Sequence, residues 1–179
     1  MKKIHKVPDE YIVVDFETTK VDRFSRHRVS EIIEIGAVKV QRDKITERFK
    51  TYVCPVIEKI NKADTDLCGI KYSDVLKAPK FKEAIKMFSD FSENLPIYSW
   101  GDRDEKFVKN NKRLLFVEEG RSDFIDAQRI FIDTLKKNGV EINLPSVTNA
   151  MIYVGEEFSG TAHDALTDAE NTAKIIMKM

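Results

Sequence analysis

Residues 11–19, YIVVDFETT, constrain the fold most, because they form an almost continuous run of β-branched and aromatic residues. This pattern is typical of a strand whose two faces are both buried, so the segment is expected at the centre of a sheet. Two more strand-like segments follow, SEIIEIGAVKV at 30–40 and ITERFKTYVCP at 45–55, joined by the polar turn QRDK. Such short connections cannot form parallel crossovers, so the three strands are predicted to form an antiparallel meander.

The rest of the chain alternates between helical and strand-like patterns. Helical spacing begins near Ala63 and includes an apolar face from Phe81 to Leu95, which Pro96 ends. Strands are then predicted at 96–101 and 122–126, and helices at 104–116, at 127–137, within 144–155 and at the end of the chain. This order predicts one α/β domain over residues 1–179, with a mixed β-sheet of three antiparallel and two further strands flanked by helices. In such sheets, ligands bind at the carboxyl ends of the strands.

Charge and cysteine content narrow the functional classes. The 30 basic residues balance the 30 acidic ones, so any attraction for nucleic acid must come from local patches. Cys54 and Cys68 form no CxxC pair and are typical of a reducing compartment rather than of a disulfide framework. The apolar run in MKKIHKVPDEYIVVDFE is too short and too often interrupted by charge for a signal peptide or a membrane span. The expected location is therefore the cytoplasm.

Acidic residues recur where predicted strands end and predicted helices begin. Asp15 and Glu17 lie two residues apart near the end of the first strand, so their side chains project to one side while Phe16 projects to the other. Asp102 and Asp104 follow the fourth strand, where the dipole of a helix also favours acids. The alternative is that the two pairs are only a solvated strand end and a helix cap.

A third cluster lies at the start of the final helix, in GTAHDALTDAENTA. His163 and Asp168 lie there among small residues, and Thr161 with Asp164 matches a capping box. Taken alone, a helical histidine is more often a packing or surface residue. Together, the three clusters bring several carboxylates and one imidazole to one crevice. Such a donor set favours Mg²⁺ or Mn²⁺ over Zn²⁺, and two such ions can hold the attacking and leaving oxygens of a phosphodiester.

These residues resemble the DEDD superfamily of 3′→5′ exonucleases, in its His-containing DEDDh branch with the DnaQ-like or RNase T-like fold. The resemblance rests on DFETT, WGDRDEKF and HDALTD, which occur in the family's order across nearly the whole chain, and on DLCGIKYSDVLKAPKF between the first two. Within the superfamily, the chain is most similar to the Eri-like and KapD-like branch, whose members mostly act on RNA. The resemblance implies an RNase H-like sheet and a metal-dependent 3′→5′ exonuclease that uses two Mg²⁺ or Mn²⁺ ions and releases 5′-mononucleotides.

Carried over onto this sequence, the resemblance implies a general base and four metal ligands. The implied catalytic set is His163 as the base and, as metal ligands, Asp15, Glu17, Asp104 and Asp168. A neutral imidazole accepts a proton from water, so activity is expected to fall as His163 becomes protonated. Asp104 is preferred to Asp102 because Phe107 follows it by three residues, as in the family's second motif. Arg103 stands where the family often has an aromatic residue.

Substrate contacts are expected beside the first and second motifs. The candidates are Thr18, Thr19, Phe16 and Trp100, with core packing as the alternative for Phe16. Basic residues in KVDRFSRHRV at 20–29, and on the helix at 104–116, offer phosphate contacts, with plain solvation as the alternative. The expected partner is single-stranded nucleic acid, RNA more than DNA, with no membrane partner and with protein partners left open. A DNA-directed proofreading-type or oligoribonuclease-like exonuclease is one alternative, and a noncatalytic nucleic-acid-binding module is another.

Overall fold

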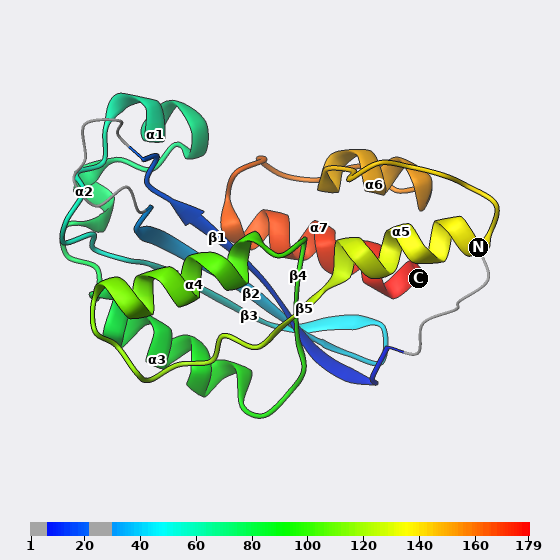
Figure 1. The fold of residues 1–179 in the computed structure, drawn as a ribbon, viewed down its shortest axis with the longest axis horizontal. Coiled ribbons are helices and arrows are strands. Elements are labelled where there is room, and N and C mark those ends of the chain that lie inside the picture. Colours follow the sequence, from blue (N-terminus) through cyan, green and yellow to red (C-terminus); the bar gives the residue numbers. More distant parts are fainter. Residues whose placement is uncertain (1–6, 22–29) are drawn as a thin grey trace.

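One five-stranded sheet organises the computed structural model, which describes residues 7–21 and 30–179. The strand order is β3-β2-β1-β4-β5, so β1 (Glu10–Thr18) is central (Figure 1). β2 (Ile32–Gln41) pairs antiparallel with β1, and β3 (Lys44–Tyr52) pairs antiparallel with β2. β4 (Ile97–Ser99) lies parallel to β1, and β5 (Phe124–Asp126) lies parallel to β4. The predicted meander and the mixed sheet with two further strands are confirmed.

Helices cover both faces of the sheet (Figure 1). On one face lie α3 (Phe81–Ser92) and α4 (Arg103–Leu114), and on the other lie α5 (Ala127–Lys137), α6 (Val147–Tyr153) and α7 (Ala165–Lys178). Two short helices, α1 (Lys62–Cys68) and α2 (Tyr72–Val75), connect β3 to α3. Among the described residues, no helix has the length and apolar character needed to pass through a bilayer.

β1 is central because its side chains are apolar on both faces. Tyr11 and Val13 pack into the cluster that includes α5, α6 and α7, whereas Ile12 and Val14 pack into the cluster that includes α3 and α4. All four side chains are at most 2% exposed. After the exposed Glu10 at the start of the strand, the next acidic residues are Asp15 and Glu17, which lie near the carboxyl end of the strand, close to the starts of α4 and α7.

The first turn of α7 lies directly against β2 at Gly36, the residue that pairs with Asp15. A Cβ atom on Gly36 would lie 2.1 Å from the backbone nitrogen of Leu166 and 2.2 Å from the carbonyl carbon of Ala165. Both distances are far below van der Waals contact, so only glycine admits the helix at this depth. The close approach brings the start of α7 beside β1.

Gly36→Ala is expected to destabilise the fold by about 1–3 kcal/mol or more, as overpacking of a well-packed interior does. The added methyl group would meet backbone atoms, which can yield only if the start of α7 moves away from the sheet. Urea unfolding followed by circular dichroism measures this free energy of unfolding. An unfolding midpoint equal to that of the parental protein would show that α7 does not depend on this contact.

Candidate active site

The first acidic pair lies near the carboxyl end of β1. Asp15 and Glu17 alternate with Phe16, so they lie on the side of the sheet where α7 packs. Burial raises the pKa of Asp15 well above its usual range, and the neighbouring carboxylates of Asp104 and Asp168 raise it further. The pKa of Glu17 is raised to about 8, first by burial and then by Asp168 and other nearby acids. These shifts follow from the burial of the carboxylates and from their closeness to one another.

Asp104 reaches this site from the first turn of α4 and is 6% exposed. Its pKa is raised to about 8, because burial outweighs the lowering effect of Arg103 and Asp168 adds to the rise. The side chain of Asp102, in contrast, is 59% exposed and forms an ion pair with Lys106. Asp102 occupies the N-cap position, but its side chain caps no backbone amide. The structure therefore places Asp104, and not Asp102, with the other acids.

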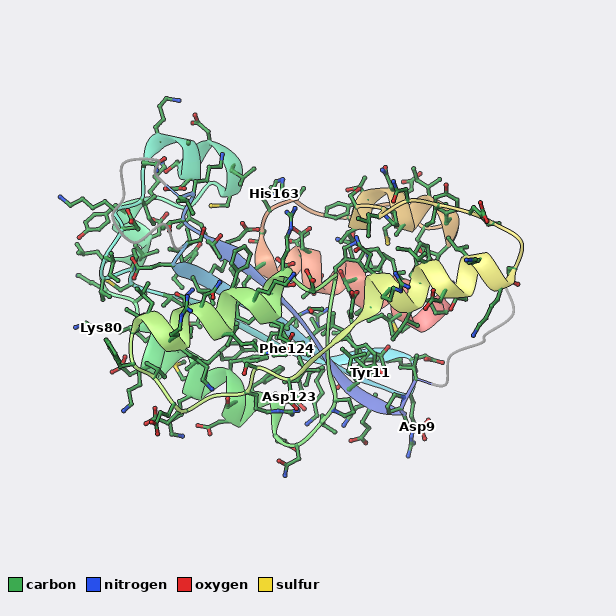
Figure 2. All side chains as sticks on the ribbon, in the orientation of Figure 1. Asp9, Tyr11, Lys80, Asp123, Phe124 and His163 are labelled. Atoms are coloured by element: carbon green, nitrogen blue, oxygen red, sulfur yellow. The ribbon has the colours of Figure 1, made fainter. Side chains whose placement is uncertain are left out.

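The third cluster differs from its predicted local structure. α7 begins at Ala165, so His163 precedes the helix and lies on the loop that leads from α6 (Figure 2). Asp164 is the N-cap, and its Oδ1 accepts a hydrogen bond from the backbone N–H of Thr167 at 3.0 Å. The predicted capping box of Thr161 with Asp164 is therefore wrong, because Asp164 itself caps the helix.

His163 has a left-handed backbone, with a φ of 63°. Its backbone N–H donates to Oδ2 of Asp168 at 3.0 Å, which ties the loop to the first turn of α7. Burial raises the pKa of Asp168, and this hydrogen bond and the imidazole of His163 offset part of the rise. A left-handed conformation is uncommon in residues other than glycine and persists where the surroundings hold it, often at functional sites.

The side chains that converge here form a suitable metal site. Ligand atoms of Glu17, His163 and Asp168 all lie within 4.8 Å of one another. Asp15 and Asp104 lie close to this group. Asp104, Asp168 and Glu17 all raise the pKa of Asp15, and Asp104 has the largest effect of the three. Carboxylate oxygens are hard ligands that suit Mg²⁺ and Mn²⁺, and a cation would relieve the mutual repulsion of these acids.

Two residues that sequence reasoning missed lie at the edge of this site. Glu34 pairs in register with Glu17 on the adjacent strand and is 1% exposed. Its Oε2 accepts a hydrogen bond from the backbone N–H of Ala165 at 2.9 Å, and its Oε1 lies 3.0 Å from Nζ of Lys50. Burial raises the pKa of Glu34, and these contacts offset part of the rise. An acid within the apolar strand EIIEIGAV was the available signal, because a buried carboxylate needs a partner.

Two of the expected substrate contacts have other roles. Phe16 is 5% exposed, and the centroid of its ring lies 6.0 Å from those of Phe88 and Phe124. It faces the side opposite the acids, so the expectation that its side chain contacts substrate is wrong. The hydroxyl of Thr19, which is 1% exposed, accepts a hydrogen bond from the backbone N–H of Glu31 at 3.0 Å. Thr19 therefore links the chain after β1 to the chain before β2 and does not face a sugar.

Thr18 and Trp100 both remain partly accessible. Thr18 is half-buried at the end of β1. Trp100 lines a cavity of about 520 Å³ that lies between the starts of α4 and α5. Its Nε1 donates to the carbonyl oxygen of Pro145 at 2.8 Å, which orients the indole ring. Arg103 lines the same cavity, and its charge lies close enough to Asp104 to offset part of the rise that burial causes in the pKa of that carboxyl.

Basic side chains near the site form two groups. Most of the loop KVDRFSRHRV, from 22 to 29, lies outside the described residues. On α4, Lys106 and Lys109 form ion pairs with acids one turn away, and Nζ of Lys112 donates to the carbonyl oxygen of Gly120 at 2.7 Å. These contacts within the protein favour the alternative for the basic residues of α4, namely that they solvate the helix surface and do not bind phosphate.

The metal-free protein is expected to lose thermal stability as the pH rises. Glu17 and Asp104 have pKa values of about 8 in the folded state, above the ordinary carboxyl range, so protonation favours folding. This stabilisation is complete below the ordinary carboxyl pKa of about 4 and is lost as the pH rises through about 8. Thermal scans across this range in chelator measure the fall, which added Mg²⁺ should reduce. If the thermal midpoint fell equally with pH in the parental protein and in Glu17→Gln, both in chelator, the raised pKa of Glu17 would be contradicted.

The chain is similar to known proteins in both sequence and structure. The family model of the RNase T exonucleases matches residues 12–176. A PolC-type DNA polymerase III from Caldanaerobacter subterraneus subsp. tengcongensis is 32% identical over 95% of this chain, which spans 11% of that polymerase. The probable 3′-5′ exonuclease KapD of Bacillus subtilis is 28% identical over 92% of this chain and 81% of its own length. The nuclease domain of 3′hExo, a DEDDh family member bound to rAMP, has a TM-score of 0.82 at 22% identity, covering 96% of this chain and 91% of that one.

Proposed function

This chain belongs to the RNase T family of exonucleases, and we propose that it is a DEDDh exonuclease, which hydrolyses single-stranded nucleic acid from the 3′ end and releases 5′-mononucleotides. The resemblance inferred from DFETT, WGDRDEKF and HDALTD is confirmed at the level of the family. One observation carries the proposal: β1, α4 and α7 bring together beside His163 the carboxylates of Asp15, Glu17, Asp104 and Asp168.

We assign the four acids to metal binding. Mg²⁺ or Mn²⁺, bound as a pair, would stabilise negative charge on the attacking and leaving oxygens of the phosphodiester. Glu17 and Asp168 offer ligand atoms in the same small group as His163, and Asp15 and Asp104 complete the acidic wall. Burial and mutual repulsion raise the pKa values of these carboxyls, and a bound cation would favour their ionised form.

We assign proton transfer to the imidazole of His163. The residue is exposed beside the acids, and its position depends on its backbone N–H, which donates to Asp168. The imidazole, in its neutral form, accepts the proton of the attacking water, and a well-placed general base contributes about 10²–10⁴-fold to the rate.

Substrate binding is assigned to Thr18 and to the cavity beside α4. Trp100 and Arg103 bring to that cavity an indole and a guanidinium, groups that stack on bases and pair with phosphates. We propose RNA as the preferred substrate, with support from the similar fold of a nuclease domain bound to rAMP. DNA is the rival substrate, and the sequence similarity to PolC-type DNA polymerases favours it.

We further propose that residues 1–179 act as one exonuclease domain in the cytoplasm. A single sheet with helices on both faces accounts for the described residues. Cys54 and Cys68 are both free thiols, which fits a reducing compartment.

Product analysis on RNA and DNA oligonucleotides of matched sequence tests the proposed activity. With Mg²⁺ or Mn²⁺, a 5′-labelled strand should shorten stepwise from its 3′ end while 5′-mononucleotides accumulate, and RNA should shorten faster than DNA. Chelation should abolish both changes. Activity that persists in chelator, or products cut internally, would contradict the proposal, and binding without turnover would favour a noncatalytic module.

A further inference from the structure

Lys50, on the edge strand β3, forms ion pairs with two carboxylates at the border of the acidic site. Its Nζ lies 3.0 Å from Oε1 of Glu34 and also contacts Oδ2 of Asp164. The side chain of Lys50 is 32% exposed, whereas that of Glu34 is 1% exposed. Lys50 therefore provides a positive charge to the buried carboxylate of Glu34. Glu34 in turn pairs with Glu17 on the adjacent strand.

Both partners of Lys50 hold the first turn of α7. Oε2 of Glu34 accepts a hydrogen bond from the backbone N–H of Ala165, the first residue of the helix, at 2.9 Å. Oδ1 of Asp164 caps the helix by accepting from the backbone N–H of Thr167 at 3.0 Å. Lys50 thus connects β3 to the helix start through one charged group and two carboxylates.

The residue placed by this arrangement is His163. It directly precedes Asp164 and has the left-handed backbone described above, which persists only where neighbouring contacts hold it. The backbone N–H of His163 donates to Asp168 on α7. The next residue, Asp164, forms an ion pair with Lys50 on the sheet. Without Lys50, the loop keeps its bond to α7 but loses the charged link between Asp164 and the sheet.

We propose that Lys50 is a positioning residue that sets the imidazole of His163 against the acids on β1. This inference rests on the proposed exonuclease function. Lys50 acts through Asp164 and Glu34 and does not itself touch the reacting atoms. Its loss should therefore lower kcat with little change in KM, because substrate binding uses other residues while the geometry of proton transfer is disturbed.

Lys50→Met tests the proposal, because methionine keeps an unbranched apolar side chain and removes the charge. We expect kcat on the RNA oligonucleotide to fall about tenfold or more, as misplacement of a catalytic group commonly causes. Arg48→Met is the matched control. Arg48 lies on the same strand, and its Nε forms an ion pair at 2.6 Å with Glu170 farther along α7. Its removal should leave kcat at the parental value, and Lys50→Arg should restore most of the loss.

A second measurement separates positioning from general damage. In a His163→Ala background there is no imidazole to place, so Lys50→Met should lower kcat by no more than about twofold further. An equal loss of kcat in both backgrounds would overturn the proposal, as would parental kcat in Lys50→Met or an equal loss in Arg48→Met. Parental protein without metal-dependent exonuclease activity would instead refute the proposed function, so the two failures are distinguishable.

Removal of Lys50 leaves Glu34 buried without its cation, and the single variant is open to instability for that reason alone. The double variant Lys50→Met with Glu34→Gln avoids this problem, since the amide oxygen of glutamine still accepts from Ala165. We expect the thermal midpoint of the double variant to return towards the parental value while its kcat stays low. Recovery of kcat together with stability would show that Lys50 only neutralises Glu34 and would overturn the positioning role.

Discussion

Asp15→Asn should lower kcat on an RNA oligonucleotide by about 10³-fold or more, because a catalytic metal site contributes several kcal/mol of transition-state stabilisation. Asparagine has nearly the shape of aspartate but lacks the charge that a divalent cation requires. Asp15 lies at the centre of the site, where Asp104, Asp168 and Glu17 all raise its pKa. Turnover in Mg²⁺ and in Mn²⁺, measured at saturating substrate, gives the size of the loss.

The same substitution should reduce the loss of stability of the metal-free protein as the pH rises, because burial and the neighbouring acids raise the pKa of Asp15 and asparagine cannot ionise. Thermal unfolding in chelator measures this effect, which separates loss of activity from loss of fold. Asp9→Asn is the matched control, since Asp9 is exposed just before the amino end of β1, far from His163 (Figure 2). Parental turnover in Asp15→Asn, or an equal loss in Asp9→Asn, would contradict the assignment of the metal site.

His163→Ala should lower kcat by about 10²-fold or more, as loss of a general base does. The fold should persist, because the side chain of His163 is exposed and its contribution to the loop is a backbone N–H that alanine keeps. Single-turnover kinetics with excess enzyme measure the chemical step without product release. Added imidazole should restore part of the rate in His163→Ala but none in Asp15→Asn, because free imidazole can accept a proton but cannot replace a metal ligand.

A rate for His163→Ala equal to that of the parental protein would exclude the residue as the base. An equal restoration of both variants by imidazole would point to catalysis by the added base in solution. The two variants together therefore distinguish proton transfer from metal binding, which the geometry alone places in one small site.

The architecture was largely predictable, because the spacing of apolar residues along a segment indicates which of its faces are buried. The run YIVVDFETT could serve only a strand covered on both faces, and the structure has β1 at the centre of the sheet. The same alternation separates Phe16 from the acids, and Phe16 has the core role that was only the alternative to substrate contact. The role of Thr19 was less predictable. Its hydroxyl accepts a hydrogen bond from the backbone N–H of Glu31, and local sequence patterns do not show that these two residues lie side by side.

The contacts that support the site depend on which residues of distant segments lie side by side, and local sequence patterns do not predict this. Gly36 matters because α7, far along the chain, lies on it, and Lys50 matters because β3 passes the start of that helix. The start of α7 was misjudged because Thr161 and Asp164 are both good capping residues, and the sequence does not show which of them the sheet holds. Glu34 resolves this choice by binding the N–H of Ala165.

The reacting groups are divided between the first strand and the last helix of the domain. Asp15 and Glu17 lie on β1, whereas Asp168 lies on α7. A nascent chain emerges with its amino-terminal part first, and contacts between such distant segments form only once both are available. A ribosome-bound chain that still lacks α7, or a proteolytic fragment without it, therefore lacks Asp168 and has only part of the acidic site. The acidic site that we propose to bind metal is therefore complete only once α7 has packed against the sheet at Gly36.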